Sequence, residues 1–317
     1  YCNFKSSSTP ILEPLLLCLG KRICPMGAQM RIWPRERIYG KRISVNSRSP
    51  ETRGAAQSAA SKVPRQPRPD WLRVRLPHSE SYFRMKELVR EHRLNTICED
   101  ARCPNIGECW GAGTATFMIL GNVCTRRCRF CAVKTGRPPG YDLDEPRRIA
   151  DAIRKLGLRY AVITSVDRDD LEDGGAWIFA ETIRRTQEAC PGIQIEVLIP
   201  DFRGNAAALR TVVEAKPDVL GHNVETVPRL YPVARAGSRY QRSLAVLRRA
   251  KSFGIATTTK SGLMLGLGEG TAEVYEVLKE LVQSRVDIVT LGQYLQPGRE
   301  LLPVERFYSP EEFNQFR

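Results

Sequence analysis

Apolar runs and amphipathic segments alternate along the chain from about residue 113 to its end. Short apolar runs rich in β-branched residues predict strands at residues 116–120, 160–164, 194–199, 219–223, 256–264 and 287–294. Between them, apolar positions recur at helical spacing, which predicts helices at residues 145–156, 177–189, 206–215, 240–253 and 271–284. Six strands that alternate with helices predict an α/β fold whose parallel sheet curves into a barrel or part of one.

The chain before residue 113 has a different character. Residues 1–69 show no sustained period and are rich in Arg, Ser and Pro, so we expect a disordered basic leader, either a transit peptide or irrelevant upstream residues. Residues 70–112 form a compact stretch that carries three cysteines after a helix predicted at residues 81–93. We therefore divide the chain into this leader, an N-terminal extension at 70–112 and a barrel at 113–317.

The net charge of +14 suggests a nucleic-acid partner until its distribution is considered. Residues 1–65 hold twelve Lys or Arg and three Glu, so they carry nine of these charges and leave five for the rest of the chain. The basic character thus belongs mostly to the leader, and we expect no nucleic acid as partner. No apolar run is long enough to span a bilayer, so we expect no membrane partner either.

Three cysteines, Cys124, Cys128 and Cys131, have the spacing C-x3-C-x2-C in NVCTRRCRFCAVKTGRP. One short loop can place three thiolates around an iron–sulfur cluster, and three ligands on four irons leave one iron open for a small molecule. A zinc site is the alternative, but it normally needs a fourth ligand, and no Cys or His lies near enough in sequence. An aromatic side chain at Phe130 could flank a bound nucleoside.

A second trio, Cys98, Cys103 and Cys109, has the spacing C-x4-C-x5-C in TICEDARCPNIGECW. Alone, this spacing fits zinc or a buried cysteine pair equally well. Beside the other triplet it favours a second cluster, because each group lacks a fourth local protein ligand. Six of the ten cysteines crowd into this region, which favours metal binding over disulfides and indicates a reducing compartment.

The C-x3-C-x2-C loop resembles that of the radical S-adenosylmethionine (SAM) superfamily, and its combination with C-x4-C-x5-C resembles the lipoyl synthase family in particular. The resemblance runs from about residue 69 to the end, in eight blocks that keep the family's order: PDWLRVRLP, CEDARCPNIGECW, ATFMILGNVCTRRCRFCAVKTGRP, VITSVDRDDLEDGGA, IEVLIPDFRGN, HNVETVPRLY, TTKSGLMLGLGE and LGQYLQP. It implies a partial TIM-like (β/α)6 barrel of the radical SAM type.

The resemblance also implies two 4Fe-4S clusters with SAM as cofactor. Cys124, Cys128 and Cys131 would hold the cluster that reduces SAM to give a 5'-deoxyadenosyl radical, which takes hydrogen from carbons six and eight of an octanoyl chain. Cys98, Cys103 and Cys109 would hold an auxiliary cluster that is consumed as the sulfur source, so that the enzyme is a sulfurtransferase.

The octanoyl chain would be attached to a lysine of a lipoyl carrier domain, as in 2-oxoacid dehydrogenase acyltransferase subunits and the glycine cleavage H protein. The mild basic excess of the barrel suits an acidic carrier. An electron donor such as ferredoxin or flavodoxin is also implied. We expect a cytoplasmic enzyme, or one of the mitochondrial matrix or plastid stroma if residues 1–65 are a transit peptide.

Polar residues at predicted strand ends are candidates for contacting SAM or the octanoyl-lysine: Thr164, Ser165, Asp167, Asn223, Glu225, Lys260 and Ser261. Each could equally be a satisfied polar residue of the barrel mouth. The charge run at residues 168–170 is read as solvated. The glycines at positions 262, 266 and 268 are explained as well by close strand packing as by a phosphate loop.

The chain departs from the family at its end. Lipoyl synthases normally carry an Arg-Ser-Ser-Tyr block whose serine supplies the fourth ligand of the auxiliary cluster, whereas this chain stops at PEEFNQFR. We expect a truncated C-terminus. Two alternatives stay open: another sulfur-inserting radical SAM enzyme, similar to biotin synthase, which would not explain the C-x4-C-x5-C triplet, and a zinc protein that binds nucleic acid through its basic leader.

Overall fold

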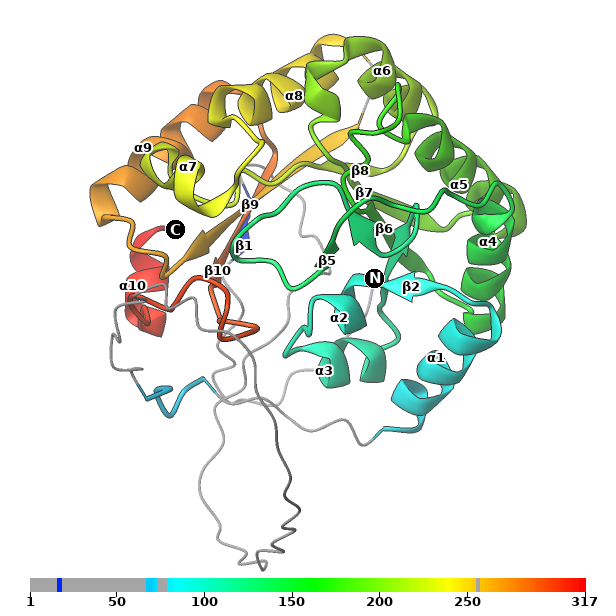
Figure 1. Ribbon diagram of the computed structural model, residues 1–317, viewed down its shortest axis with the longest axis horizontal. Coiled ribbons are helices and arrows are strands. Elements are labelled where there is room, and N and C mark those ends of the chain that lie inside the picture. Colours follow the sequence, from blue (N-terminus) through cyan, green and yellow to red (C-terminus); the bar gives the residue numbers. More distant parts are fainter. Residues whose placement is uncertain (1–15, 19–66, 73–78, 255–256) are drawn as a thin grey trace, which may run out of the picture.

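The computed structural model describes residues 16–18, 67–72, 79–254 and 257–317 (Figure 1). Most of the leader predicted at residues 1–69 therefore lies outside the described residues. None of the helices in the described ranges is long and apolar enough to cross a membrane.

An eight-stranded sheet forms the centre of the molecule, in the order β1-β10-β9-β8-β7-β6-β3-β2. The six strands from β10 to β3 pair in parallel, and β2 and β1 join the two edges antiparallel. The strands are β1 (Leu16–Cys18), β2 (Asn95–Thr96), β3 (Thr116–Ile119), β6 (Tyr160–Ser165), β7 (Gln194–Leu198), β8 (Val219–Gly221), β9 (Thr258–Leu265) and β10 (Ile288–Gln293). Parallel pairing throughout the six inner strands confirms the expected α/β class.

Helices follow the parallel strands and cover the outer face of the curved sheet, as the arc of ribbons in Figure 1 shows. They are α4 (Glu145–Leu156), α5 (Ala176–Ala189), α6 (Ala206–Glu214), α8 (Tyr240–Ser252), α9 (Thr271–Gln283) and α10 (Pro310–Gln315), with short turns η1 (Phe202–Gly204), η2 (Pro228–Leu230) and α7 (Tyr231–Ala234). Burial of their apolar faces against the strands supplies the main stabilisation, since apolar area removed from water is the dominant favourable contribution to folding.

The N-terminal extension packs onto the same core. Helix α1 (Glu80–Glu91) is capped by Ser79, whose hydroxyl accepts a hydrogen bond from the amide of Tyr82 at 3.2 Å. Strand β2 then leads into α2 (Ile97–Asp100) and α3 (Ile106–Gly111). Because β2 pairs with β3 and Trp110 is fully buried in the core shared with β3 and α4, this extension is joined to the sheet.

The strands and helices predicted from periodicity are confirmed to within a few residues. The pattern did not predict β2, α2, α3, α7 or α10, because elements of two to six residues are too short to show a period. It also did not predict β4 (Val123–Cys124) and β5 (Lys134–Thr135), which form a separate two-stranded sheet. In the described residues the main sheet has two edges, at β1 and β2.

Candidate functional site

The C-x3-C-x2-C triplet lies in the connection from β3 to α4. After β3 the backbone turns through two left-handed residues, Leu120 with φ 67° and Gly121 with φ 83°. The connection then closes on itself, because β4 and β5 pair in parallel with Cys124 opposite Thr135. The three cysteines lie at or between these two strands, beyond the carboxyl end of β3, which is the end of a parallel sheet where catalytic loops lie.

Backbone amides point at the sulfur of Cys124. The N–H of Arg126 donates to it at 3.4 Å and the N–H of Asp167 at 3.3 Å. Burial, together with the nearby Asp167 carboxyl, raises the pKa of the Cys124 thiol to about 11. A thiol in this position needs a strong positive charge to become a thiolate, which a bound metal would supply.

Cys128 and Cys131 have similar surroundings. The N–H of Arg129 donates to the carbonyl of Ala234 at 2.9 Å, beside a β-bridge between Cys128 and Arg235. Burial raises the pKa of Cys128 to about 12, although the charge of Arg235 lowers it, and burial likewise raises the pKa of Cys131. Three half-buried, unpaired thiols on one loop have the donor chemistry that an iron–sulfur cluster needs.

The C-x4-C-x5-C triplet spans α2 and α3. Cys98 is buried, and its pKa is raised by burial but lowered by the amide of Thr116 and the indole of Trp110, which face its sulfur. Burial and then the thiols of Cys103 and Cys98 raise the pKa of Cys109 to about 11, so the three sulfurs lie near one another. Thr116 begins β3, whereas Cys124 lies past its other end, so the two triplets are separated by the length of this strand.

No group of three His, Cys, Asp or Glu side chains within the described ranges is arranged to hold a single metal ion. A four-iron cluster distributes its thiolates over different iron atoms, so it needs them spaced more widely than a mononuclear site does. Six free cysteines in two trios on neighbouring elements therefore fit two clusters by donor chemistry and by number.

Asn223 and Glu225 lie together after β8. Their side chains are hydrogen-bonded, and burial raises the pKa of Glu225, although Arg235 lowers it. Glu225 adopts a left-handed backbone with φ 66°, and its amide donates to the carbonyl of Gly262 at 2.9 Å. A Cβ at Gly262 would lie 2.8 Å from Asn223 Oδ1, so this glycine leaves room for the Asn223 side chain. Close packing between strands, rather than a phosphate loop, thus explains the glycine at position 262.

Three further candidates lie at the end of β6 or just after it. Thr164 donates its hydroxyl to the carbonyl of Leu198 at 2.9 Å, whereas the buried Ser165 hydroxyl has no partner. Asp167 Oδ2 is 3.9 Å from Cys124 Sγ. Its Oδ1 lies 3.3 Å from an Arg126 nitrogen but without hydrogen-bond geometry, so this buried oxygen has unused acceptor capacity.

The structure does not bring Lys260 to this group. Its ammonium pairs with both oxygens of the buried Glu196 carboxylate, at 2.8 and 3.0 Å, and Tyr160 donates to the same carboxylate. Lys260 lies early in β9, in register with Gly221, whereas the contacts of Asn223 and Glu225 come later in that strand. Ser261 instead accepts the amide of Val224 at 3.2 Å.

The interpretation of residues 168–170 as a solvated charge run is wrong for Arg168, whereas the side chains of Asp169 and Asp170 remain 30% and 35% exposed. Arg168 is 2% exposed and donates to the carbonyls of Leu120 and Gly140 as well as to Asp170, so it ties the cysteine loop to the β6–α5 connection. Asp169, unlike Asp170, pairs with Arg126 rather than with Arg168, and both of its carboxylate oxygens accept hydrogen bonds from that guanidinium. Local sequence could not show this, because the partners lie in different connections.

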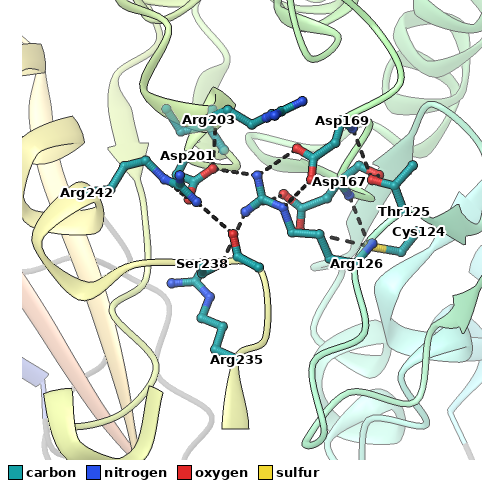
Figure 2. Close-up of polar contacts among 12 residues, drawn as sticks. Cys124, Thr125, Arg126, Asp167, Asp169, Asp201, Arg203, Arg235, Ser238 and Arg242 are labelled. Carbon is teal, nitrogen blue, oxygen red and sulfur yellow. Dashed lines mark hydrogen bonds and ion pairs between the residues drawn. The ribbon is translucent and has the colours of Figure 1, made fainter. Parts of the chain in front are cut away.

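Sequence reasoning also missed the network around Arg126 (Figure 2). This arginine follows Cys124 by two residues, and its guanidinium meets carboxylates from the connections after β6 and β7. His222, fully buried after β8, is a second residue that was not singled out; its Nδ1 contacts the carbonyl of Ile199 at 2.8 Å and its Nε2 has no partner. The sequence signal for Arg126 was its position two residues after Cys124, and the signal for His222 was its position next to Asn223.

Comparison with known proteins decides the family. A model of the radical SAM superfamily matches residues 118–281, and a model of the N-terminal domain of lipoyl synthase matches residues 43–103. The lipoyl synthase of Koribacter versatilis is 56% identical over 78% of this chain and 81% of its own length. The mitochondrial lipoyl synthase of Nematostella vectensis is 53% identical over 80% of this chain and 87% of its own. The chain belongs to the lipoyl synthase family.

Family membership means a sulfur-inserting radical SAM enzyme with SAM and iron–sulfur chemistry, and it confirms the resemblance read from the eight blocks. It sets aside both the biotin-synthase-like alternative and the zinc protein. The N-terminal match begins at residue 43, upstream of the boundary predicted at residue 70.

Solved structures agree on the fold. The chain superposes on HydG, a maturase of the [FeFe]-hydrogenase, with a TM-score of 0.51 at 15% identity, covering 73% of this chain and 52% of that one. HydG from Carboxydothermus hydrogenoformans gives a TM-score of 0.50 at 15% identity, covering 74% of this chain and 62% of that one. At this identity the likeness concerns the fold alone, and it confirms the expected radical SAM architecture.

Proposed function

We propose that this chain inserts two sulfur atoms, at carbons six and eight, into an octanoyl group carried by a lysine of a lipoyl carrier domain. The observation that carries the proposal is the pair of separate cysteine trios, one in the loop after β3 and one on α2 and α3. One trio suffices for SAM cleavage, whereas a second trio is needed to hold a sulfur source. The relatives named lipoyl synthase support the same assignment.

Cys124, Cys128 and Cys131 are proposed to hold the cluster that binds SAM. When bound, this cluster supplies the electron that cleaves SAM and so starts hydrogen abstraction from the octanoyl chain. The protein contributes orientation: amides of Arg126 and Asp167 aim at Cys124 Sγ, and the β4–β5 pair closes the loop. Amide donors to cluster sulfurs are one of the means by which proteins tune these centres.

Cys98, Cys103 and Cys109 are proposed to hold the auxiliary cluster, which makes two 4Fe-4S clusters per chain. Residues 70–112 thus act as an auxiliary-cluster extension of the barrel at 113–317. Strand β3 has four residues, about 13 Å at the usual rise, and the two trios flank its ends.

Five polar side chains are proposed to contact SAM or the octanoyl-lysine. Thr164 and Ser165 end β6, Asp167 follows it, and Asn223 and Glu225 follow β8. The Ser165 hydroxyl supports this, because it is buried without a hydrogen-bond partner, and such atoms are rare and indicate a ligand or ordered water. Asp167 Oδ1 also accepts no hydrogen bond, although it lies 3.3 Å from the Arg126 guanidinium.

Two further residues complete the proposed set. Phe130, half-buried between two cluster cysteines, can cover the nucleoside. Lys260, paired with Glu196, is proposed to shape the barrel interior below these contacts.

An acidic carrier domain suits the mouth of the site. A cavity of about 580 Å³ lies beside the Arg126 network, and the exposed Arg203 and Arg239 line it without making an ion pair in the described part of the chain. Arg129 is exposed on the cysteine loop itself. Carriers of 2-oxoacid dehydrogenases and the glycine cleavage H protein are the proposed substrates, and carrier association should weaken with salt. Unchanged binding between low and high salt would exclude charge steering.

A small acidic electron carrier such as ferredoxin or flavodoxin is the proposed reductant, and neither nucleic acid nor membrane is a proposed partner. The proposed compartment is the cytoplasm, or the mitochondrial matrix or plastid stroma where residues 1–65 act as a transit peptide. The relative from Nematostella vectensis is a mitochondrial protein by name. Cell fractionation distinguishes these compartments.

Anaerobic turnover tests the proposed function. The reconstituted chain should hold about eight irons and eight sulfides. With SAM, dithionite and an octanoyl-lysine peptide it should yield a product with two added sulfurs by mass spectrometry. A folded, iron-loaded chain that cleaves SAM but adds no sulfur would contradict sulfur insertion, and a chain that binds zinc in place of iron would contradict the whole assignment.

A further inference from the structure

Arg126 lies inside the cysteine loop, two residues after Cys124 and two before Cys128, yet its side chain points away from solvent. Only 3% of the side chain is exposed. Transferring a guanidinium from water into such a site costs several kcal/mol unless partners surround it. The loop therefore depends on the groups that surround this arginine.

Three carboxylates and one hydroxyl surround the guanidinium (Figure 2). Asp169 accepts two hydrogen bonds, from Nε and Nη2, each at 2.7 Å. Asp201 accepts from Nη2 at 2.7 Å, and Ser238 accepts from Nη1 at 3.1 Å. Asp167 completes the group with an ion pair of 3.3 Å. Such planar, forked contacts are specific to arginine, because an ammonium is a point charge.

The partners come from different connections, so one side chain joins several segments. Asp167 and Asp169 follow β6, Asp201 follows β7, and Ser238 precedes α8. Asp201 has no exposed side-chain surface and also pairs with Arg242 at 2.7 Å. Burial alone would raise the pKa of Asp201, but its hydrogen bonds from Arg126 and Arg242 hold that pKa well below the usual range. Asp201 is therefore ionised at neutral pH.

Backbone hydrogen bonds link the position of Arg126 to that of the Cys124 sulfur. The N–H and the hydroxyl of Thr125 both donate to the carbonyl of Asp167, at 3.0 and 2.9 Å, and the amide of Asp169 donates to the Thr125 hydroxyl at 3.0 Å. The amide of Arg126 itself donates to Cys124 Sγ. Moving the guanidinium would therefore move the peptide that orients Cys124.

We propose that Arg126 is a positioning residue for the cluster held by Cys124, Cys128 and Cys131, because its guanidinium fastens the cysteine loop to the ends of β6 and β7. The proposal rests on the proposed ligand role of these cysteines. A second effect has the same direction: Asp167 Oδ2 lies 3.9 Å from Cys124 Sγ, and without Arg126 this carboxylate would face the cluster thiolates with one compensating cation fewer, which disfavours a negatively charged cluster.

The test compares Arg126→Lys with Arg127→Lys. Both substitutions keep the charge and lie in the same loop, but Arg127 is exposed. Each full-length variant is reconstituted anaerobically, and two properties are measured: the rate at which a chelator removes iron, and the change in the EPR spectrum of the reduced protein when SAM is added. The second readout reports the SAM-binding cluster and would not respond to a general loss of stability.

In Arg126→Lys, about half of the iron should leave about 10- to 100-fold faster than in the wild type, which is the usual effect of removing a group that orients metal ligands. Its SAM-dependent EPR change should be lost or altered, while Arg127→Lys should match the wild type. Wild-type iron retention and an unchanged EPR response in Arg126→Lys would overturn the proposal.

Asp169→Asn keeps the inference falsifiable if Arg126→Lys does not fold, because it removes one charge of the bidentate pair without changing its shape. It should show the same two changes to a smaller degree, and a folded Asp169→Asn protein with wild-type behaviour would overturn the inference. A wild-type protein without any SAM-responsive cluster would contradict the proposed function itself, and with it this inference. If SAM changes the EPR spectrum of the wild type and of Arg126→Lys equally, the result contradicts this inference but leaves the proposed function standing.

Discussion

The two cysteine triplets are held in place by different kinds of interaction. Cys98 is 7% exposed within the hydrophobic core, where it packs with the fully buried Trp110. Cys124 lies in a long connection whose position depends on the ion pairs of Arg126 and on the hydrogen bonds of Arg168 to the carbonyls of Leu120 and Gly140. The first triplet is therefore supported by apolar packing and the second by a polar network.

This difference suits the proposed roles. Apolar packing around α2 and α3 does not depend on iron, so the scaffold can persist while an auxiliary cluster is dismantled and rebuilt. The cluster proposed for the second triplet would have to keep one position through repeated turnovers. A loop fastened by directional ion pairs gives that precision, because forked Arg–carboxylate contacts restrict both distance and orientation.

The largest expected effect comes from replacing the first triplet alone. Cys98, Cys103 and Cys109 changed together to Ala should lower the iron content from about eight to about four per chain. Sulfur insertion should vanish while SAM cleavage under dithionite continues, because the second triplet does not rely on the first. Cys190→Ala, which removes a cysteine outside both trios, should change neither activity. A folded triple variant that no longer cleaves SAM would show that the two regions are not separable.

Trp110 tests the apolar side of the comparison. Trp110→Ala should lower the free energy of unfolding by about 3–5 kcal/mol, because it empties a large fully buried site. Urea unfolding under anaerobic conditions measures this change. Trp177→Ala, at a tryptophan that is 46% exposed, should cost much less. Equal costs at the two positions would contradict the claim that packing holds the first region.

His222 tests the polar side through pH. Burial lowers its pKa from 6.5 to about 4, so between these values the unfolded chain binds more protons than the folded one. The stability that depends on neutral His222 is therefore complete above pH 6.5 and is lost as the pH falls toward 4, by about 3 kcal/mol at most. His222→Asn should not show this loss. If the unfolding free energies of the wild type and His222→Asn change in parallel with pH, the neutral state of His222 does not contribute to stability in this way.

Gly262 gives the smallest effect. Gly262→Ala would place a methyl group against Asn223, so we expect SAM to bind about tenfold more weakly, equivalent to about 1.4 kcal/mol. Gly292→Ala is the matched control, because a Cβ there meets nothing within 4 Å on the adjacent strand β10. Calorimetric titration of the anaerobic holoenzyme with SAM compares the two. Equal affinities would remove Asn223 from the proposed SAM site.

Regular elements were predictable from sequence, whereas contacts between connections were not. The helix at residues 145–156 was predicted to the residue, because its apolar face repeats over three turns. The spacing of Cys124, Cys128 and Cys131 indicated a cluster site, and the trio of Cys98, Cys103 and Cys109 gained meaning only beside it. The partners of Arg126 lie 43 and 75 residues away at Asp169 and Asp201, and no local pattern indicates which charges meet. For the same reason Arg168, adjacent to two acidic residues, was misread as solvated.

The central claim is that the loop after β3 holds the cluster that cleaves SAM. Its most direct test is the yield of 5'-deoxyadenosine under dithionite from a protein in which Cys124, Cys128 and Cys131 are all changed to Ala. We expect this variant to yield no more 5'-deoxyadenosine than a reaction without enzyme, while its first triplet still retains iron. A yield equal to that of the wild type would contradict it.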